Sequence, residues 1–523
     1  MIQFRSNGRP FDTVKGRPFF YDEIRKGTFL YGGNTMTKQR KAKDPEHIGF
    51  KECFGTTTLS FTNALTGVLM SSMLMVYMTE YSGISYAALL ATILLMAARV
   101  IDAVDDPIQG FIIDNSKRTR IGKYKPFFLI SIIMEAIGAI ALFSLPSSMA
   151  NTPALIIAWV VVFYLVYDIG SSFYKDLLLY RTMSTDENQR TKLVIGPRLM
   201  SFLTGVVANV VFTAAIVALN AGGVSYHDAA ARVIMILVVA SMAISLVGWF
   251  MVKEKHHVEE ERAEKLSLQD FFDLFKENKA MVIFAFKGLF AGFIWTLIFA
   301  TPIYYIKWGF CADLSTGIAD MEQFTVYNGI NAIITVVPMV LGAILGRPLL
   351  KLFKDPVRMT STLLLIQAVG GAILFIAQIT GLLQNAPWLF FATMFIMATG
   401  VGTDFVPQTF VQMEVVDYGI YKTGKDRSAL TTVTDGFITK MQTAFSAAIV
   451  GLVLTGIGYT VEEGNRFAGD VTQIPTMLNW FIVIMGLVPA VLGIISVLIY
   501  RKYPVTNEVR GEMKAYFDRQ SKE

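Results

Sequence analysis

Twelve apolar segments, each about as long as a bilayer is thick, constrain the fold more than any other feature of the sequence. A helix needs roughly 20 apolar residues to cross the hydrocarbon core, and a spanning helix satisfies its own backbone hydrogen bonds. The chain is 53% hydrophobic and only 17% charged, which is too apolar for an ordinary soluble domain. The sequence therefore predicts an all-α polytopic membrane protein with spans at residues 57–80, 87–113, 126–146, 153–178, 193–220, 230–252, 280–306, 324–347, 357–380, 388–411, 429–458 and 474–500.

Basic residues are distributed unevenly between alternate loops. With the amino terminus in the cytosol, the cytosolic loops hold 21 Lys and Arg residues, whereas the opposite loops and span ends hold three, Arg232, Lys307 and Arg466. Lys and Arg accumulate in cytoplasmic loops. We therefore expect a multi-pass protein of the plasma or inner membrane with both termini in the cytosol, and no secretory signal is evident before the first apolar run.

The longest internal connection divides the chain into two six-helix halves. We expect a basic, disordered cytosolic arm at residues 1–50, a first half at 51–252, a linker at 253–279, a second half at 280–500 and a cytosolic tail at 501–523. Apolar residues at positions 268, 271, 272 and 275 predict a short amphipathic helix on the inner membrane surface. For the arm, a solvated tail is favoured over contact with anionic lipid headgroups.

One apolar segment carries charges in its middle, in the sequence Arg99-Val-Ile-Asp-Ala-Val-Asp-Asp-Pro107. At 100° per residue, Asp102 and Asp106 share one helix face, and Arg99 joins them one turn earlier. Each such charge costs about 2.5–3.5 kcal/mol in a bilayer, so this face should look into the protein or into water. The pair indicates a path for a cation or proton. The alternative is a structural ion pair of Arg99 with an acid.

Enzyme and nucleic-acid functions find no support in the sequence. Its two cysteines, Cys53 and Cys311, lie far apart, and its four histidines show no ligand spacing, so we expect no disulfide framework, resident metal or other cofactor. There is no nucleophile and base pair, no phosphate loop and no soluble catalytic domain. Two further charges lie within the spans, Lys287 and Asp404, and for these we expect no role beyond pairing.

The twelve spans and a glycine-and-arginine loop after the second span of each half resemble the major facilitator superfamily. Within it, the chain after residue 50 resembles the glycoside–pentoside–hexuronide:cation symporters, the melibiose-permease-like family. The resemblance is carried by four motifs in the same order: Arg99-x-x-Asp102-Ala-x-x-Asp106-Pro-x-x-Gly110 with Gly122-Lys-Tyr-Lys-Pro126, Asp186-Glu-Asn-Gln-Arg190-Thr through Pro197-Arg198, Asp417-Tyr-Gly-Ile-Tyr-Lys422, and Lys440.

The resemblance implies roles for individual residues. Asp102 and Asp106 would form the site of the coupling cation, Na⁺ or H⁺, and Lys440 would contribute to coupling. Arg198 would contact substrate or an acid. Residues near the inner gate would be Arg99, Asp114, Arg118, Arg120 and Asp417. For Arg198 and Lys440, a structural ion pair and snorkelling to the interface are the alternatives.

The sequence departs from the family where sugar should bind. The family's sugar-binding aspartates of spans one and four align with Ala64, next to Asn63, and with Phe173. Asp176 lies one helical turn from Phe173 and could replace the lost acid; Asn63, Lys175 and Asp176 are therefore the substrate-site candidates. Alternatively, Lys175 takes the place of sodium near Asp102 and Asp106, or it faces Asp168, with which it shares a face at i+7.

These features predict a secondary active transporter for a sugar, glycoside or sugar acid, coupled to a cation or proton and working by alternating access. The alternatives are an uncoupled facilitator of a small polar or anionic solute, and a transporter of lysophospholipids on the same fold. We expect a monomer whose partners are its small-molecule substrate and membrane lipid, and no nucleic acid.

Overall fold

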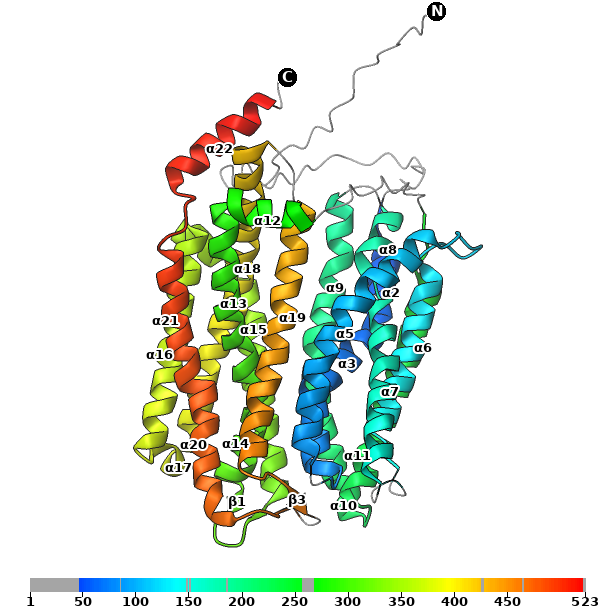
Figure 1. Cartoon of the computed structure of the whole chain (residues 1–523), viewed down its shortest axis with the longest axis vertical. Coiled ribbons are helices and arrows are strands. Elements are labelled where there is room, and N and C mark those ends of the chain that lie inside the picture. Colours follow the sequence, from blue (N-terminus) through cyan, green and yellow to red (C-terminus); the bar gives the residue numbers. More distant parts are fainter. Residues whose placement is uncertain are drawn as a thin grey trace, which may run out of the picture.

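The computed structural model describes residues 47–84, 86–146, 149, 152–184, 187–255, 268–424, 428–462 and 465–520. These residues form long, nearly parallel helices arranged in two bundles that stand side by side (Figure 1). Short strands lie at one end of the bundles, and helices α12 and α22 lie at the other. We call these two ends the β-sheet end and the α22 end.

The first bundle holds the elements before residue 252. They are α2 (Phe50–Leu59), α3 (Phe61–Val68), η1 (Leu69–Met73), α4 (Leu74–Val76), η2 (Tyr77–Tyr81), α5 (Ala87–Asn115), α6 (Lys125–Leu142), α7 (Pro153–Ser172), α8 (Asp176–Met183), α9 (Glu187–Val206), η4 (Val207–Val211), α10 (Phe212–Ala221) and α11 (Tyr226–Met251).

The second bundle holds the elements after residue 267. They are α12 (Leu268–Glu277), α13 (Lys279–Ala300), α14 (Pro302–Phe310), β1 (Ala312–Asp313), β2 (Ile318–Ala319), α15 (Met321–Phe353), α16 (Pro356–Ile379), α17 (Leu382–Asn385), α18 (Pro387–Thr423), α19 (Ser428–Gly456), β3 (Val461–Glu462), β4 (Arg466–Phe467), η5 (Val471–Gln473), α20 (Ile474–Ile482), η6 (Val483–Leu487), α21 (Val488–Tyr500) and α22 (Asn507–Gln520).

Each of the twelve predicted spans coincides with one helix or with a run of consecutive helical elements. Within the described residues, nine of these are long enough and contain an apolar stretch long enough to cross a membrane. Three more contain only a shorter apolar stretch, at Ala87–Ala98 in α5, Phe212–Ala221 in α10 and Phe445–Gly456 in α19. The all-α polytopic architecture predicted from the sequence is confirmed.

A small antiparallel sheet at the β-sheet end joins two interhelical loops that are far apart in the sequence. In the described residues its strand order is β1-β2-β4-β3, and Ile318 of β2 pairs with Arg466 of β4. Strands β1 and β2 connect α14 to α15, whereas β3 and β4 connect α19 to α20. The sheet therefore fixes the ends of four helices of the second bundle to one another.

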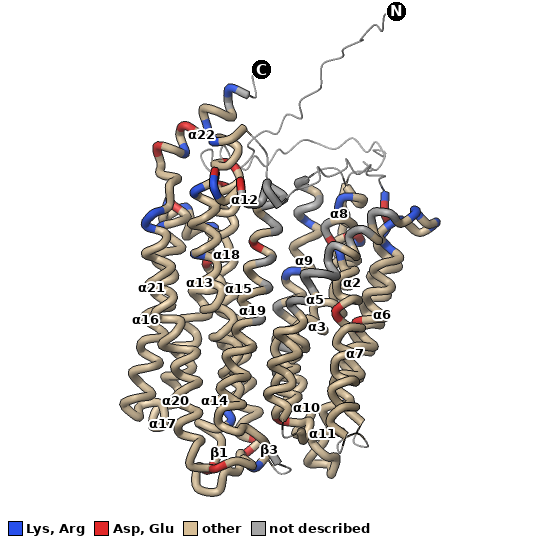
Figure 2. Tube along the Cα trace, in the orientation of Figure 1, with Lys and Arg blue, Asp and Glu red and all other residues tan. Residues whose placement is uncertain are grey.

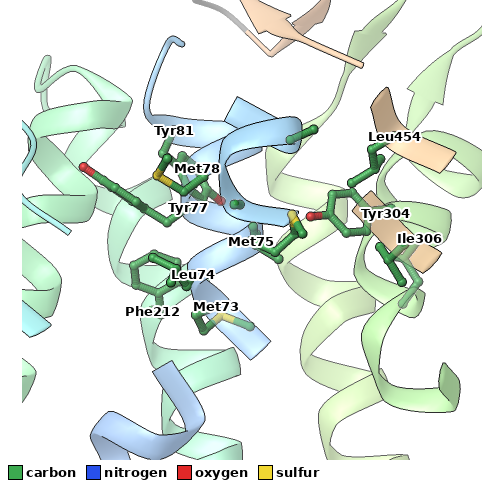
Figure 3. Close-up of a cluster of buried hydrophobic side chains, with 14 of the residues drawn as sticks. Met73, Leu74, Met75, Tyr77, Met78, Tyr81, Phe212, Tyr304, Ile306 and Leu454 are labelled. Carbon is green, nitrogen blue, oxygen red and sulfur yellow. The ribbon is translucent and has the colours of Figure 1, made fainter. Parts of the chain in front are cut away.

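The buried apolar side chains of the described residues form three clusters. The largest lies toward the β-sheet end and takes side chains from both bundles. Figure 3 shows part of it, where Met75 of α4 in the first span lies next to Tyr304 of α14, with Leu454 of α19 beside Tyr304. Toward the α22 end each bundle has its own cluster, one around Phe284 and Val415 and the other around Phe128 and Leu193.

Two helices lie at the α22 end outside the spans. Helix α12 forms at the place where the sequence predicts an amphipathic helix. Helix α22 was not predicted. Its Arg510 donates to Asn507 at 2.8 Å and forms ion pairs with Glu414 of α18 and Asp355. These charged contacts between residues about 100 or more apart in sequence hold α22 at the end of the second bundle.

Close helix packing makes one glycine substitution a test of the fold. A Cβ at Gly402 of α18 would lie 2.2 Å from the Met339 carbonyl oxygen and 2.3 Å from its Cα, on α15. We expect Gly402→Ala to lower the free energy of unfolding by about 1–3 kcal/mol, because two helix backbones must separate. Gly67→Ala is the control, since its Cβ meets nothing within 4 Å and alanine favours helix. Equal thermal unfolding temperatures for the two variants would contradict this packing.

Candidate functional site

Three spans are polar in the half that lies nearer the α22 end. Helix α5 is apolar to Ala98 and then enters the charged stretch at Arg99; α9 is polar before the apolar α10; and α19 is polar before its apolar stretch begins at Phe445. The predicted residues Asp102 and Asp106, Arg198, and Lys440 lie in these three polar halves. The fold thus brings three motifs from distant parts of the sequence to a similar depth along the bundles.

Helices α5 and α19 pack against each other across the two bundles (Figure 1). They approach each other closely in their apolar halves, where a Cβ on Gly451 would lie 1.6 Å from the Thr92 hydroxyl oxygen. The side chains of Arg99, Asp102, Asp106, Asp114 and Lys440 lie outside the described residues, so their assigned roles stay predictions.

The predicted fourth span is not one continuous helix. Helix α7 ends at Ser172, and α8 begins at Asp176. Lys175, before α8, has φ −111° and ψ 75°, which is not helical. The shared helix faces expected for Lys175 with Asp168 and for Asp176 with Phe173 are therefore wrong. Gly170-Ser-Ser favours helix weakly and an aspartate favours a helix start, which explains the break.

The candidates near this break differ in exposure. Asp168 is buried, Lys175 and Asp176 are half-buried, and Arg198 on α9 is exposed. The charges of Arg198 and Asp176 both act on the Tyr180 hydroxyl. Asp176 and Tyr180 lie one turn apart on α8, so Arg198 of α9 and Asp176 share a neighbour there. The contact of either residue with a substrate stays a prediction.

Asn63, the remaining substrate-site candidate, contacts an acid that the sequence analysis missed. Its amide nitrogen donates to Glu135 Oε1 of α6 at 3.1 Å. Glu135 is fully buried. The signal was present in the sequence, because a single acid within the apolar run Ile132-Ile-Met-Glu-Ala-Ile137 is costly in a bilayer.

The predicted gate residues at the α22 end make few described contacts. Arg118 and Arg120 are exposed, and among the described residues neither forms an ion pair. Asp417 is half-buried on α18. The loop that carries the arginines is held by Glu254, whose carboxylate accepts from the backbone N–H groups of Lys123 and Tyr124 at 2.9 and 2.8 Å. Figure 2 shows that Lys and Arg gather at this end.

Gly122 is required by this arrangement, which explains its place in the family motif. Its φ is +128°, and a Cβ there would lie 2.3 Å from Glu254 Oε1. The bound carboxylate sits at the amino-terminal end of α6, where unpaired backbone N–H groups favour an anion.

At the β-sheet end, a buried charged pair joins the two bundles. Glu80 of η2 forms an ion pair with Lys307 of α14, and both side chains are at most 4% exposed. The Tyr459 hydroxyl also donates to Glu80, and Lys307 donates to Asn465 Oδ1 at 3.3 Å. Trp308 Nε1 donates to the Tyr459 hydroxyl at 2.6 Å. We call Glu80, Lys307, Tyr459 and Asn465 the bridging cluster.

Other contacts between the bundles lie beside the bridging cluster. Thr79 and Tyr304 are hydrogen-bonded through their hydroxyl groups at 3.1 Å, and Asn328 of α15 donates to Thr213 of α10 at 3.2 Å. Burial raises the pKa of the nearby Cys311 thiol to about 12, so this cysteine adds no charge. The β-sheet end is thus closed by apolar, hydrogen-bonded and ionic contacts together.

A further buried ion pair lies within the second bundle. Lys287 Nζ of α13 and Asp404 Oδ2 of α18 are 3.4 Å apart. The pairing expected of these two charges is therefore confirmed, and the structure shows that each is the other's partner. The Lys287 ammonium also lies 5.3 Å from the centre of the Tyr500 ring. Because these residues all belong to the second bundle, this pair holds that bundle together and does not join the two.

Comparison with known proteins is consistent with this arrangement. The family described as "MFS/sugar transport protein" matches residues 57–507. The chain is 23% identical to the "Uncharacterized symporter YnaJ" of Bacillus subtilis (strain 168), over 91% of this chain and 98% of that protein. It is 23% identical to the "Isoprimeverose transporter" of Lactiplantibacillus pentosus, over 80% of this chain and 82% of that protein.

A solved structure shows the same fold. The crystal structure of the peptide transporter POT in complex with sulfate has a TM-score of 0.57 and 14% sequence identity, and the match covers 88% of this chain and 96% of that one. At this identity the likeness concerns the arrangement of the helices alone.

Proposed function

Since the chain belongs to the MFS/sugar transport protein family, within the glycoside–pentoside–hexuronide symporters, we propose that it carries a sugar, glycoside or sugar acid by symport with Na⁺ or H⁺. It is a membrane transporter and not an enzyme. The proposal rests on the three polar half-spans of α5, α9 and α19, which place the charged motifs of both bundles at a similar depth.

The transport cycle is alternating access between the two bundles. In the conformation described here, the bundles share a core and the bridging cluster at the β-sheet end, while each has a separate core at the α22 end. We place the α22 end in the cytosol of a cell with the protein in its inner membrane, because basic residues gather there. On this assignment the structure is closed to the outside.

The substrate is recognised by three charged side chains and one amide, those of Arg198, Lys175, Asp176 and Asn63. An arginine and a lysine beside one acid suit a ligand that presents both hydroxyl groups and a carboxylate, because guanidinium binds carboxylates in a bidentate manner and Asn binds hydroxyls. Asp102 and Asp106 take the coupling cation, and Lys440 links the second bundle to them.

The test is a thermal-shift screen of the purified protein with isoprimeverose, other glycosides, hexuronates and lysophosphatidylcholine, each with and without sodium and at two pH values. A ligand that binds only the native state raises stability by about 2.7 kcal/mol at a hundred times its Kd. We expect a saccharide to raise the unfolding temperature, and to raise it further with the coupling cation.

Arg198→Ala should abolish this shift, while Arg232→Ala, which removes an exposed arginine near the β-sheet end, should leave it unchanged. A shift produced by the lysophospholipid and by no saccharide would overturn the proposed substrate class.

A further inference from the structure

Glu135 is an acid in the middle of a membrane-spanning helix. It is the eleventh of the 18 residues of α6, about 15 Å from the start of that helix at 1.5 Å per residue. Its side chain is completely buried. An acid at this depth is costly, so its partners decide whether it can carry a charge.

The partners of Glu135 are all neutral. Oε1 accepts from the Asn63 amide at 3.1 Å and from the Ser131 hydroxyl at 2.6 Å, and Oε2 lies 2.6 Å from the Thr66 hydroxyl oxygen. Among the described residues, no Lys, Arg or His forms an ion pair with it. Glu80 and Asp404, which are also buried, each have a lysine partner.

Among the described residues, no cation of the elements packed on α6 forms an ion pair with Glu135. Helix α3 holds no titratable residue, and α7 holds Asp168, Tyr164 and Tyr167. The titratable residues of α11 lie in its first turns, and are Tyr226, His227, Asp228 and Arg232. Tyr174, whose ring packs on Phe128 with centroids 4.9 Å apart, also acts electrostatically on Glu135. No positive charge in this group compensates a Glu135 carboxylate through an ion pair, so burial favours the neutral acid.

The hydrogen bonds around Thr66 suit a neutral acid. The Thr66 hydroxyl has one proton, and three acceptors lie within reach: the Thr62 carbonyl at 2.9 Å, the Asn63 carbonyl at 3.4 Å and Glu135 Oε2. If Glu135 is protonated, its O–H donates to Thr66, and Thr66 donates to the Thr62 carbonyl. The short contact is then made without burying a charge.

From this geometry we propose that Glu135 is a proton-binding site of the transporter. In the conformation closed at the β-sheet end, Glu135 is a protonated carboxylic acid. When the two bundles separate at that end, Glu135 releases the proton to water and becomes a carboxylate. The inference rests on the proposed transport function and names a proton as a cotransported ion in addition to any cation at Asp102 and Asp106.

Asn63 links this proton to the substrate. The Asn63 amide N–H stabilises the charged form of Glu135 by donating to it. If a substrate hydroxyl or carboxylate accepts this hydrogen bond instead, the carboxylate of Glu135 loses a donor, and proton binding to Glu135 becomes more favourable. By reciprocity, protonation of Glu135 frees Asn63 for the substrate. The two ligands therefore promote each other's binding, which is what a symporter requires.

The experiment uses infrared difference spectra of the purified full-length protein, with parent and Glu135→Gln compared at neutral and alkaline pH. We expect the carbonyl band of a protonated carboxylic acid in the parent at neutral pH and its loss in the variant. Asp228→Asn, which removes an exposed acid from the same bundle, should retain the band. A parent spectrum without a band attributable to Glu135 at either pH would overturn the proposal.

Transport in proteoliposomes supplies the second readout. Glu135→Gln should keep substrate counterflow and lose stimulation by an inward proton gradient on the order of tenfold, a usual size for a coupling factor. Glu135→Asp, which keeps an acid, should retain the response. Full stimulation in Glu135→Gln would contradict the inference. If the infrared band is present but no saccharide is transported, the proposed function fails and the proton site stands.

Discussion

Replacing Glu80 by Gln or Lys307 by Met is expected to open the β-sheet end of the transporter. Each substitution leaves one buried charge of the bridging cluster without its partner, which costs about 3–5 kcal/mol. That charge gains water when the bundles part, so the cost falls on the closed state alone. Since about 1.4 kcal/mol is tenfold, the equilibrium should shift toward the open state by roughly a hundredfold to a few thousandfold.

The distance between the bundles can be measured with spin labels at Ala221→Cys and Gln323→Cys, after replacement of Cys53 and Cys311. Both positions are exposed at the β-sheet end, and they belong to opposite bundles. We expect a longer distance population in each single variant and a short one in the parent.

The double variant Glu80→Gln, Lys307→Met is the matched control. It removes both charges, so it should restore much of the short population, and the two substitutions should be strongly non-additive. Additive effects, or an unchanged distance in both single variants, would show that the ion pair does not hold the bundles together.

Asp106→Cys is expected to abolish accumulation of substrate against a gradient while exchange of substrate across the membrane continues. Asp106 shares a helix face with Asp102 on α5, whose helical course is continuous from Ala87 to Asn115. If Asp102 and Asp106 bind the coupling cation as proposed, loss of one carboxylate removes the ion that drives uptake. Exchange needs only substrate binding and movement of the bundles.

The measurement compares accumulation and counterflow in the same proteoliposomes. Ile108→Cys, two residues along α5 at an exposed position, introduces the same side chain without removing a charge and should behave like the parent. Concentrative uptake retained in Asp106→Cys would exclude this residue from coupling. Repeating the assay with a sodium gradient and with a pH gradient distinguishes the role of Asp106 from that of Glu135. Glu135→Gln should reduce only the uptake that is driven by the pH gradient.

The position of the Lys175 ammonium determines whether transport is expected to depend on sodium. If its ammonium approaches Asp102 or Asp106, it takes the place of sodium, because placing like charges together is unfavourable. The break between α7 and α8 removes the helical geometry from which its direction was inferred. Sodium dependence in Lys175→Ala compared with the parent therefore remains the informative observation.

The number, order and positions of the spans were readable from the sequence because a membrane-spanning helix makes its backbone hydrogen bonds within itself. Apolar length and the sign of loop charges are local properties, and the four family motifs identified the transporter group. For the same reason, the amphipathic helix α12 was predictable from its apolar spacing. The break before Asp176 was missed because hydropathy stays high through it while helix propensity falls.

Contacts between distant segments could be found only in the tertiary structure. The sequence shows Glu80 and Lys307 as charged residues near the ends of spans. Because they are 227 residues apart, and Tyr459 is 379 residues from Glu80, the sequence does not indicate that they are in contact. Glu135 could have been noticed as an intramembrane acid, whereas its neutral partners Asn63 and Thr66 depend on how α3 packs on α6. The sequence determined which helices exist and which charges they carry; packing decided which charges are paired, because pairing depends on distances between helices that no local pattern encodes.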